Sequence, residues 1–177
     1  MPIDASVAEA LNAQLGRELG AHLQYLAVSS HFDAEGLPEL KGFFAAQAAE
    51  EHMHAMKFLA YLQDVGAKVE IPAMPAPRAS FESAEEAVAL SLDWEERVTE
   101  DINAIVDLAI ERRDHATQTF LQWFVTEQVE EVSTMGELLQ VIRRAGETNL
   151  LLVEDYVTRS LPTPGANVGG GAGGGAA

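Results

Sequence analysis

Four long segments of the chain repeat an apolar side chain every three or four residues, and acids or amides interrupt each repeat near its middle. This spacing predicts amphipathic helices that each bury one stripe of side chains. Each segment is roughly 28–31 residues long, which is about 45 Å of helix. Helices of this length are typical of bundles rather than of isolated surface helices. The sequence therefore predicts an all-α fold, a four-helix bundle.

Capping and turn residues predict where the helices begin and end. Ser6 and Ser83 are each followed three residues later by a glutamate, which is the spacing of a capping box. Pro38 suits a first helical turn and Asp114 suits a cap. A shorter apolar segment further on predicts a fifth helix. The expected helices are 6–34, 38–65, 83–113, 114–145 and 150–157.

The connection between the second and third helices, residues 66–82, is long and contains three prolines. Its 17 residues can span about 55 Å when extended, which is the whole length of the bundle. The third helix can therefore start at the same end as the second and run parallel to it, as in bundles with one long crossover. We assign the bundle and its fifth helix to residues 1–162. A Gly- and Ala-rich tail, residues 163–177, is expected to be disordered.

The acids in the four stripes are predicted to meet in one layer of the bundle. Glu18 and Glu51 lie at similar distances from the turn between their helices, and so do Glu95 and Glu131. The parallel second and third helices put both pairs at the same height. Buried carboxylates without partners are strongly destabilising, so we expect them to surround cations. The sequence therefore predicts a site for two metal ions.

The ligand types predict that the two metal positions differ. The second helix has a Glu-x-x-His pair on one face, whereas the fourth has Gln-x-x-Glu. One metal is expected to bind Glu18, Glu51 and His54. The other is expected to bind Glu51, as a bridge, with Glu95, Glu131 and the nearby Gln128.

Further side chains flank this layer. Three acids lie next to the predicted stripes of the second and fourth helices: Glu50, Glu127 and Glu130. Together with Glu131 they predict a third metal site. A solvated acidic face is the alternative explanation. Tyr25, one heptad beyond the acid of the first helix, is either an electron donor to the metals or a plain core aromatic.

Composition restricts the metal and the partners. The chain has no cysteine, so carboxylates, imidazoles and amides must hold any metal, which favours iron, manganese, magnesium or calcium. The net charge of −17 argues against a nucleic-acid partner and suits the attraction of cations, although solubility alone would also explain it. No apolar run approaches a membrane span, and no signal peptide is visible, so we expect a cytoplasmic protein without a membrane partner.

These residues resemble the bacterial non-haem ferritins of the actinobacterial type. The resemblance covers roughly residues 5–160 and is carried by residues 11–25 (LNAQLGRELGAHLQY), 47–54 (QAAEEHMH), Glu95 and 120–131 (FLQWFVTEQVEE). It implies a ferritin-like fold and a cage of 24 identical subunits, with the fifth helix lining the four-fold channels. It also implies an iron-oxidising ferroxidase centre at the six predicted ligands and a third iron site at Glu50, Glu127 and Glu130.

The resemblance separates the chain from the haem-containing bacterioferritins. Those proteins have Glu-x-x-His on the fourth helix, where this chain has Gln128-x-x-Glu131. They also place a haem-ligating methionine directly after the bridging glutamate. Here His52 has that place and Met53 follows it. No haem is therefore expected.

The expected function is iron storage. Fe(II) would be oxidised by O2 at the di-iron centre and kept as a ferric mineral inside the cage. Two alternatives remain open, a DNA-protecting mini-ferritin and a passive metal-buffering cage without ferroxidase activity. Mini-ferritins place iron between subunits and lack a fifth helix, whereas the ligands predicted here lie within one bundle.

Overall fold

The computed structural model describes residues 3–161, and the predicted tail at 163–177 lies outside the described residues. All the regular secondary structure of the described part is helical, and no strand occurs in it. None of its helices is long and apolar enough to cross a membrane. The prediction of an all-α bundle with a fifth helix is confirmed. The elements are α1 (Ala5–Ala34), α2 (Pro38–Asp64), α3 (Ala84–Glu111), α4 (His115–Ala145), the short 3-10 helix η1 (Glu147–Asn149) and α5 (Leu150–Ser160).

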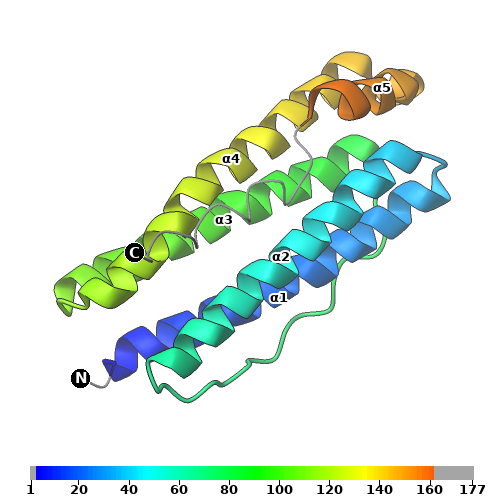
Figure 1. The fold of residues 1–177 in the computed structure, drawn as a ribbon. Coiled ribbons are helices and arrows are strands. Elements are labelled where there is room, and N and C mark those ends of the chain that lie inside the picture. The colour runs from blue at the N-terminus through cyan, green and yellow to red at the C-terminus, as the bar shows by residue number, and fades with distance from the viewer. Residues whose placement is uncertain (1–2, 162–177) are drawn as a thin grey trace, which may run out of the picture.

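The helices form two antiparallel hairpins that lie side by side, α1 with α2 and α3 with α4 (Figure 1). Residues 65–83 contain no helix and run along the bundle from the end of α2 to the start of α3. This long crossover makes α2 and α3 parallel, as predicted. Helix α5 crosses one end of the bundle, where it packs on α2 and α4.

The caps of the long helices agree with the prediction except at the first. Asp4 caps α1, because its carboxylate accepts a hydrogen bond from the backbone N–H of Ser6 at 2.9 Å. Ser6 therefore lies inside the first turn, and the predicted capping box there is wrong. Ser83 and Asp114 cap α3 and α4 as expected, each accepting from a backbone N–H three residues later at 3.0 Å.

Helices η1 and α5 each supply a carboxylate that caps the start of a long helix, α3 and α2 respectively. The N-cap residue of α2, Leu37, makes no side-chain cap bond, and Glu154 of α5 instead accepts from the backbone N–H groups of Glu39 and Leu40, both at 2.9 Å. Glu147 of η1 accepts from the first two N–H groups of α3 at 3.3 and 3.2 Å. Helix N-termini attract negative charge, so these bonds hold α5 over this end of the bundle.

The buried acids divide the core into two apolar clusters. The acid that interrupts each predicted stripe is buried: Glu18, Glu51, Glu95 and Glu131. One cluster contains Phe32 and Phe44 and the other contains Leu15 and Phe58. On every long helix the acid of the stripe lies between residues of the first cluster and residues of the second. The apolar ends of the bundle therefore fix the helices on both sides of the acid layer.

Candidate metal centre

The predicted ligands of all four helices lie in the layer between the two apolar clusters, and each is at most 5% exposed. Their burial follows from their places on the stripes, because the 4-3 spacing turns them toward the same axis as the core residues. These groups are almost completely shielded from water, so protons, hydrogen bonds or cations must balance their charge. The six residues are Glu18, Glu51, His54, Glu95, Gln128 and Glu131.

One half of the layer brings together Glu18, Glu51 and His54. Ligand atoms of these three residues all lie within 4.8 Å of one another. The Nδ1 atom of His54 is 3.4 Å from Oε2 of Glu51 and 3.9 Å from Oε2 of Glu18. Two carboxylates and an imidazole around one space match the ligand set predicted for the first metal position.

Several atoms of this group have no hydrogen-bond partner among the described residues. They are Oε2 of Glu18, Oε1 of Glu51 and Nε2 of His54, all in buried side chains. A buried polar atom without a partner destabilises the fold by about 1–3 kcal/mol. A divalent cation with oxygen and nitrogen ligands would satisfy such atoms, so the donor set fits iron in this half of the layer.

A buried amide supports this half of the site. Gln14 donates from Nε2 to Oε1 of Glu18 at 2.7 Å, which turns the other carboxylate oxygen toward Glu51 and His54. The sequence interpretation did not select Gln14. The available signal was its spacing, since it lies four residues before Glu18 on the same face of α1.

The other half of the layer is tied together by hydrogen bonds to Glu95. The hydroxyl of Tyr25 donates to Oε1 of Glu95. Gln128 donates from Nε2 to the backbone oxygen of Glu95 at 3.1 Å, to its Oε2 at 3.3 Å and to Oγ1 of Thr99 at 3.2 Å. Because the amide nitrogen serves as donor, the amide oxygen of Gln128 is the atom that can bind a cation. Glu131 lies close enough for its charge to interact with that of Glu95.

Burial is the largest influence on the pKa values of the carboxyl groups in the layer. Burial raises the pKa of Glu18, Glu51 and Glu131 well above the usual range, and the charge of a neighbouring carboxylate adds to the effect in each case. Burial also raises the pKa of Glu95 to about 7, although the Tyr25 hydroxyl opposes the shift. Without a cation the layer therefore retains protons, and a divalent cation would displace them.

Tyr25 lies beside a predicted ligand in a fully buried position. Burial and then the charge of Glu95 raise the pKa of its hydroxyl well above the ordinary value, so Tyr25 remains a phenol. The hydrogen bond from its hydroxyl to Glu95 connects Tyr25 directly to a predicted metal ligand. Its role as an electron donor stays a prediction.

The flanking acids are arranged differently from the predicted grouping. Ligand atoms of Glu50, Glu127 and His54 lie within 4.8 Å of one another, and all three side chains are buried. Glu130 is exposed on the surface of α4. Gln47 donates to Oε2 of Glu50 at 3.2 Å, and its own Oε1 is buried without a hydrogen-bond partner in the described chain. The structure thus brings His54 to the flanking pair.

Aromatic rings cover His54 on the side of α4. Trp123 and Phe124 meet its ring edge-on at centroid distances of 5.3 and 5.8 Å. The ammonium group of Lys57 lies 2.9 Å from the centre of a Trp123 ring. Desolvation lowers the pKa of Lys57, while the charges of Glu127 and Glu50 oppose the shift. Trp123 therefore packs beside the stripe.

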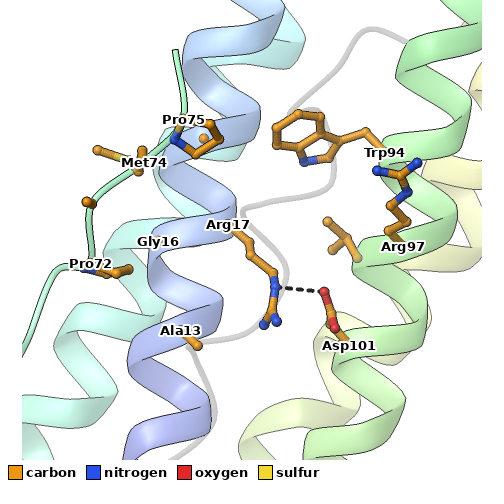
Figure 2. Close-up of a pocket in the computed structure, with 12 residues that line it drawn as sticks. Ala13, Gly16, Arg17, Pro72, Met74, Pro75, Trp94, Arg97 and Asp101 are labelled. Carbon is orange, nitrogen blue, oxygen red and sulfur yellow. Dashed lines mark ion pairs between the residues drawn. The ribbon is translucent and has the colours of Figure 1, made fainter. Parts of the chain in front are cut away.

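A cavity of about 380 Å³ lies outside the metal layer, between α1, the crossover and α3 (Figure 2). Trp94 borders it, and Arg17 pairs with Asp101 across it at 2.8 Å. The crossover packs closely here, because a Cβ atom on Gly16 would overlap Cγ of Pro72 and lie 2.8 Å from its Cδ. None of the six predicted ligands lines the cavity, so the cavity is separate from the candidate metal centre.

Comparisons with known proteins agree with this geometry. The profile of the ferritin-like domain matches residues 8–145. Ferritin BfrB of Mycolicibacterium smegmatis is 39% identical over 165 residues, covering 93% of this chain and 91% of the relative. The bacterial non-heme ferritin of Staphylococcus aureus is 35% identical over 145 residues, covering 82% of this chain and 87% of the relative.

Solved structures of ferritins have the same fold as this chain. The open pore ferritin of the hyperthermophilic archaeon Archaeoglobus fulgidus superposes with a TM-score of 0.85 at 33% identity, covering 89% of this chain and 97% of that chain. Sequence profile, relatives and fold thus agree over most of the chain. The chain belongs to the ferritin family, with relatives among the bacterial non-haem ferritins.

Proposed function

We infer that the protein stores iron, that it oxidises Fe(II) with O2 at the buried layer of carboxylates, and that it holds the ferric product inside a cage of 24 copies in the cytoplasm. The single observation that carries the proposal is the group of Glu18, Glu51 and His54. Their ligand atoms lie within 4.8 Å of one another, and one buried atom of each residue has no hydrogen-bond partner among the described residues. This pattern is expected of ligands whose partner is a metal ion.

The bridging role falls to Glu51. It belongs to the group with Glu18 and His54, and the charge of Glu95 acts on it from the other half of the layer. Two Fe(II) ions on either side of one carboxylate would lie about 3.5–4 Å apart, which suits the transfer of two electrons to one O2. The Fe(II) ions are substrates here, and the carboxylates favour their oxidation because negative ligands stabilise Fe(III) more than Fe(II).

The two iron positions are unequal. One offers the imidazole of His54, whereas the other offers the oxygens of Glu95, Glu131 and Gln128. The hydrogen bonds from Tyr25 and Gln128 hold Glu95 before any ion arrives. We therefore expect the two positions to differ in affinity for Fe(II).

A third iron position is proposed beside the first two. Glu50 and Glu127 are buried next to His54, and both raise the pKa of Lys57 electrostatically. Glu130, on the surface of α4, is proposed as its outer ligand. Together with the net charge of −17, this acidic face would draw cations toward the centre. No haem is part of the proposal.

Stopped-flow oxidation of Fe(II) tests the proposal. Glu51→Ala removes the bridge, so its oxidation rate should fall to that of Fe(II) in buffer. Glu96→Gln, a change at an exposed glutamate on the same helix as Glu95, is the matched control and should keep the wild-type rate. Equal rates for the wild type and Glu51→Ala would overturn the proposal.

The alternative functions predict other results. A passive metal-buffering cage would take up Fe(II) without consuming O2, which an oxygen electrode measures directly. A DNA-protecting mini-ferritin would retard DNA in a gel-shift assay at physiological salt. Sedimentation velocity tests the assembly of 24 copies.

A further inference from the structure

Two histidines on neighbouring helices meet outside the candidate metal centre. His22 of α1 and His52 of α2 have ring centroids 5.5 Å apart, with the ring planes tilted by 53°. In the single chain His22 is half-buried and His52 is exposed. Neither residue belongs to the ligand sets described above.

The proton position on His22 is fixed by its backbone contact. Its Nδ1 atom lies 2.7 Å from the carbonyl oxygen of Ala48. A carbonyl only accepts hydrogen bonds, so Nδ1 carries the proton and donates. The neutral ring then has its lone pair on Nε2. Metal-binding histidines typically donate their second ring N–H to a backbone carbonyl in this way, which fixes the tautomer and the ring orientation.

The spacing of the two rings suits a shared metal ion. Imidazole nitrogens bind Zn²⁺ at about 2.0–2.1 Å. With a tetrahedral angle between two such bonds, the ring centroids lie about 5 Å apart, close to the observed 5.5 Å. Ala48 precedes His52 by one helical turn, so the bond from His22 to Ala48 also sets the height of His22 beside His52.

We propose that His22 and His52 form a site for a divalent late transition-metal ion, of the class of Cu²⁺, Ni²⁺ or Zn²⁺, separate from the iron centre. Imidazole is a ligand that suits these ions, and hard cations such as Mg²⁺ or Ca²⁺ prefer oxygen. The two imidazoles occupy two coordination positions of the ion, and water molecules occupy the others. The site does not depend on the proposed iron oxidation.

Nickel binding to the full-length protein tests the site. Equilibrium dialysis against Ni²⁺, with bound nickel measured by mass spectrometry, should show fewer ions per chain for His22→Gln and for His52→Gln than for the wild type. His115→Gln is the matched control, because His115 is exposed at the start of α4, away from the pair, and should bind as the wild type does. Equal nickel content in all four proteins would overturn the proposal.

Electron paramagnetic resonance with Cu²⁺ separates this site from the iron centre. An ion between His22 and His52 has two imidazole ligands, whereas one in the iron centre has only His54. We expect a component with two-nitrogen hyperfine structure in the wild type and its loss in either variant. Unchanged iron oxidation would show that each variant folds. A spectrum that contains only one-nitrogen species in the wild type would refute the site.

Discussion

The raised pKa of Glu95 leads to a measurable dependence of stability on pH in the metal-free protein. Burial is the main cause of the shift from the ordinary value of 4.5 to about 7. A carboxyl group with a raised pKa binds its proton more tightly in the folded state than in the unfolded state. Its contribution to stability is therefore complete below about pH 4.5 and is lost as the pH rises through about 7.

Replacement of Glu95 by glutamine (Glu95→Gln) removes this titration. From the two pKa values, the free energy of unfolding of the wild type should fall by about 2–3 kcal/mol between pH 5 and pH 8 because of this residue. The variant should not show this fall. The new amide still offers an oxygen to Tyr25, but the 3.3 Å bond from Gln128 loses its acceptor. That loss, about 1 kcal/mol, applies at both pH values and cancels in the comparison between them.

Thermal unfolding of the metal-free protein is the assay. A change of about 2–3 kcal/mol corresponds to about 5–10 °C in Tm for a domain of this size. Relative to the wild type, the Tm of Glu95→Gln should therefore rise by this amount between pH 5 and pH 8, at one protein concentration and one scan rate. Glu96→Gln changes an exposed neighbour and should show no such rise.

Addition of Zn²⁺, which O2 does not oxidise, should make the Tm of the wild type higher than that of Glu95→Gln at pH 8. The ion stabilises the ionised carboxylate of the wild type, whereas the neutral amide of the variant is a poorer ligand. A Tm difference between the wild type and Glu95→Gln that is the same at pH 5 and pH 8 would refute the reasoning. It would mean that the metal-free fold holds Glu95 in the same ionisation state as the unfolded chain.

Four further substitutions test other parts of the structure. Gly16→Ala directs a methyl group at Pro72, where it would overlap Cγ and lie 2.8 Å from Cδ. Denaturant titration should show a net loss of stability, because overpacking costs about 1–3 kcal/mol while the gain in helix propensity is at most about 1 kcal/mol. Gly42→Ala, with nothing within 4 Å, should gain stability, and equal effects at both glycines would contradict the close packing. Glu154→Ala removes the acceptor of two N–H groups at the start of α2, so a loss of about 2 kcal/mol and faster proteolysis of α5 are expected. Unchanged cleavage would show that other contacts hold α5. Tyr25→Phe should slow iron oxidation and abolish any tyrosyl radical signal formed with O2, and an unchanged rate and signal would exclude Tyr25 as the electron donor.

The sequence by itself determined the helices and the layer of acids. A 4-3 spacing turns each stripe toward one axis whatever the partner helix is, so stripe residues such as Glu51 and Glu95 were predicted to be buried from their positions alone. The length of the crossover fixed the direction of α3, because residues 65–83 can reach the far end of the bundle. Both results rest on distances along one chain, which the sequence contains.

Only the tertiary structure decided which side chains touch across helices. Spacing along α4 did not separate Glu127, which is buried beside His54, from Glu130, which is exposed, because both lie one step from the stripe. The choice depends on how far α4 is rotated against α2, and that rotation is set by packing of rings such as Phe58 on Phe124.

The relative rotation and height of the helices also determine the contacts between side chains at the candidate site and at the ends of the bundle. The hydrogen bond from Tyr25 to Glu95, the caps from Glu154 and the meeting of His22 with His52 each join groups on different helices. Periodicity gives the face on which a residue lies but not the height and rotation of the neighbouring helix. These relative positions arise when the two apolar clusters pack, and they determine which of the buried polar atoms find a partner within the protein and which are left for metal ions.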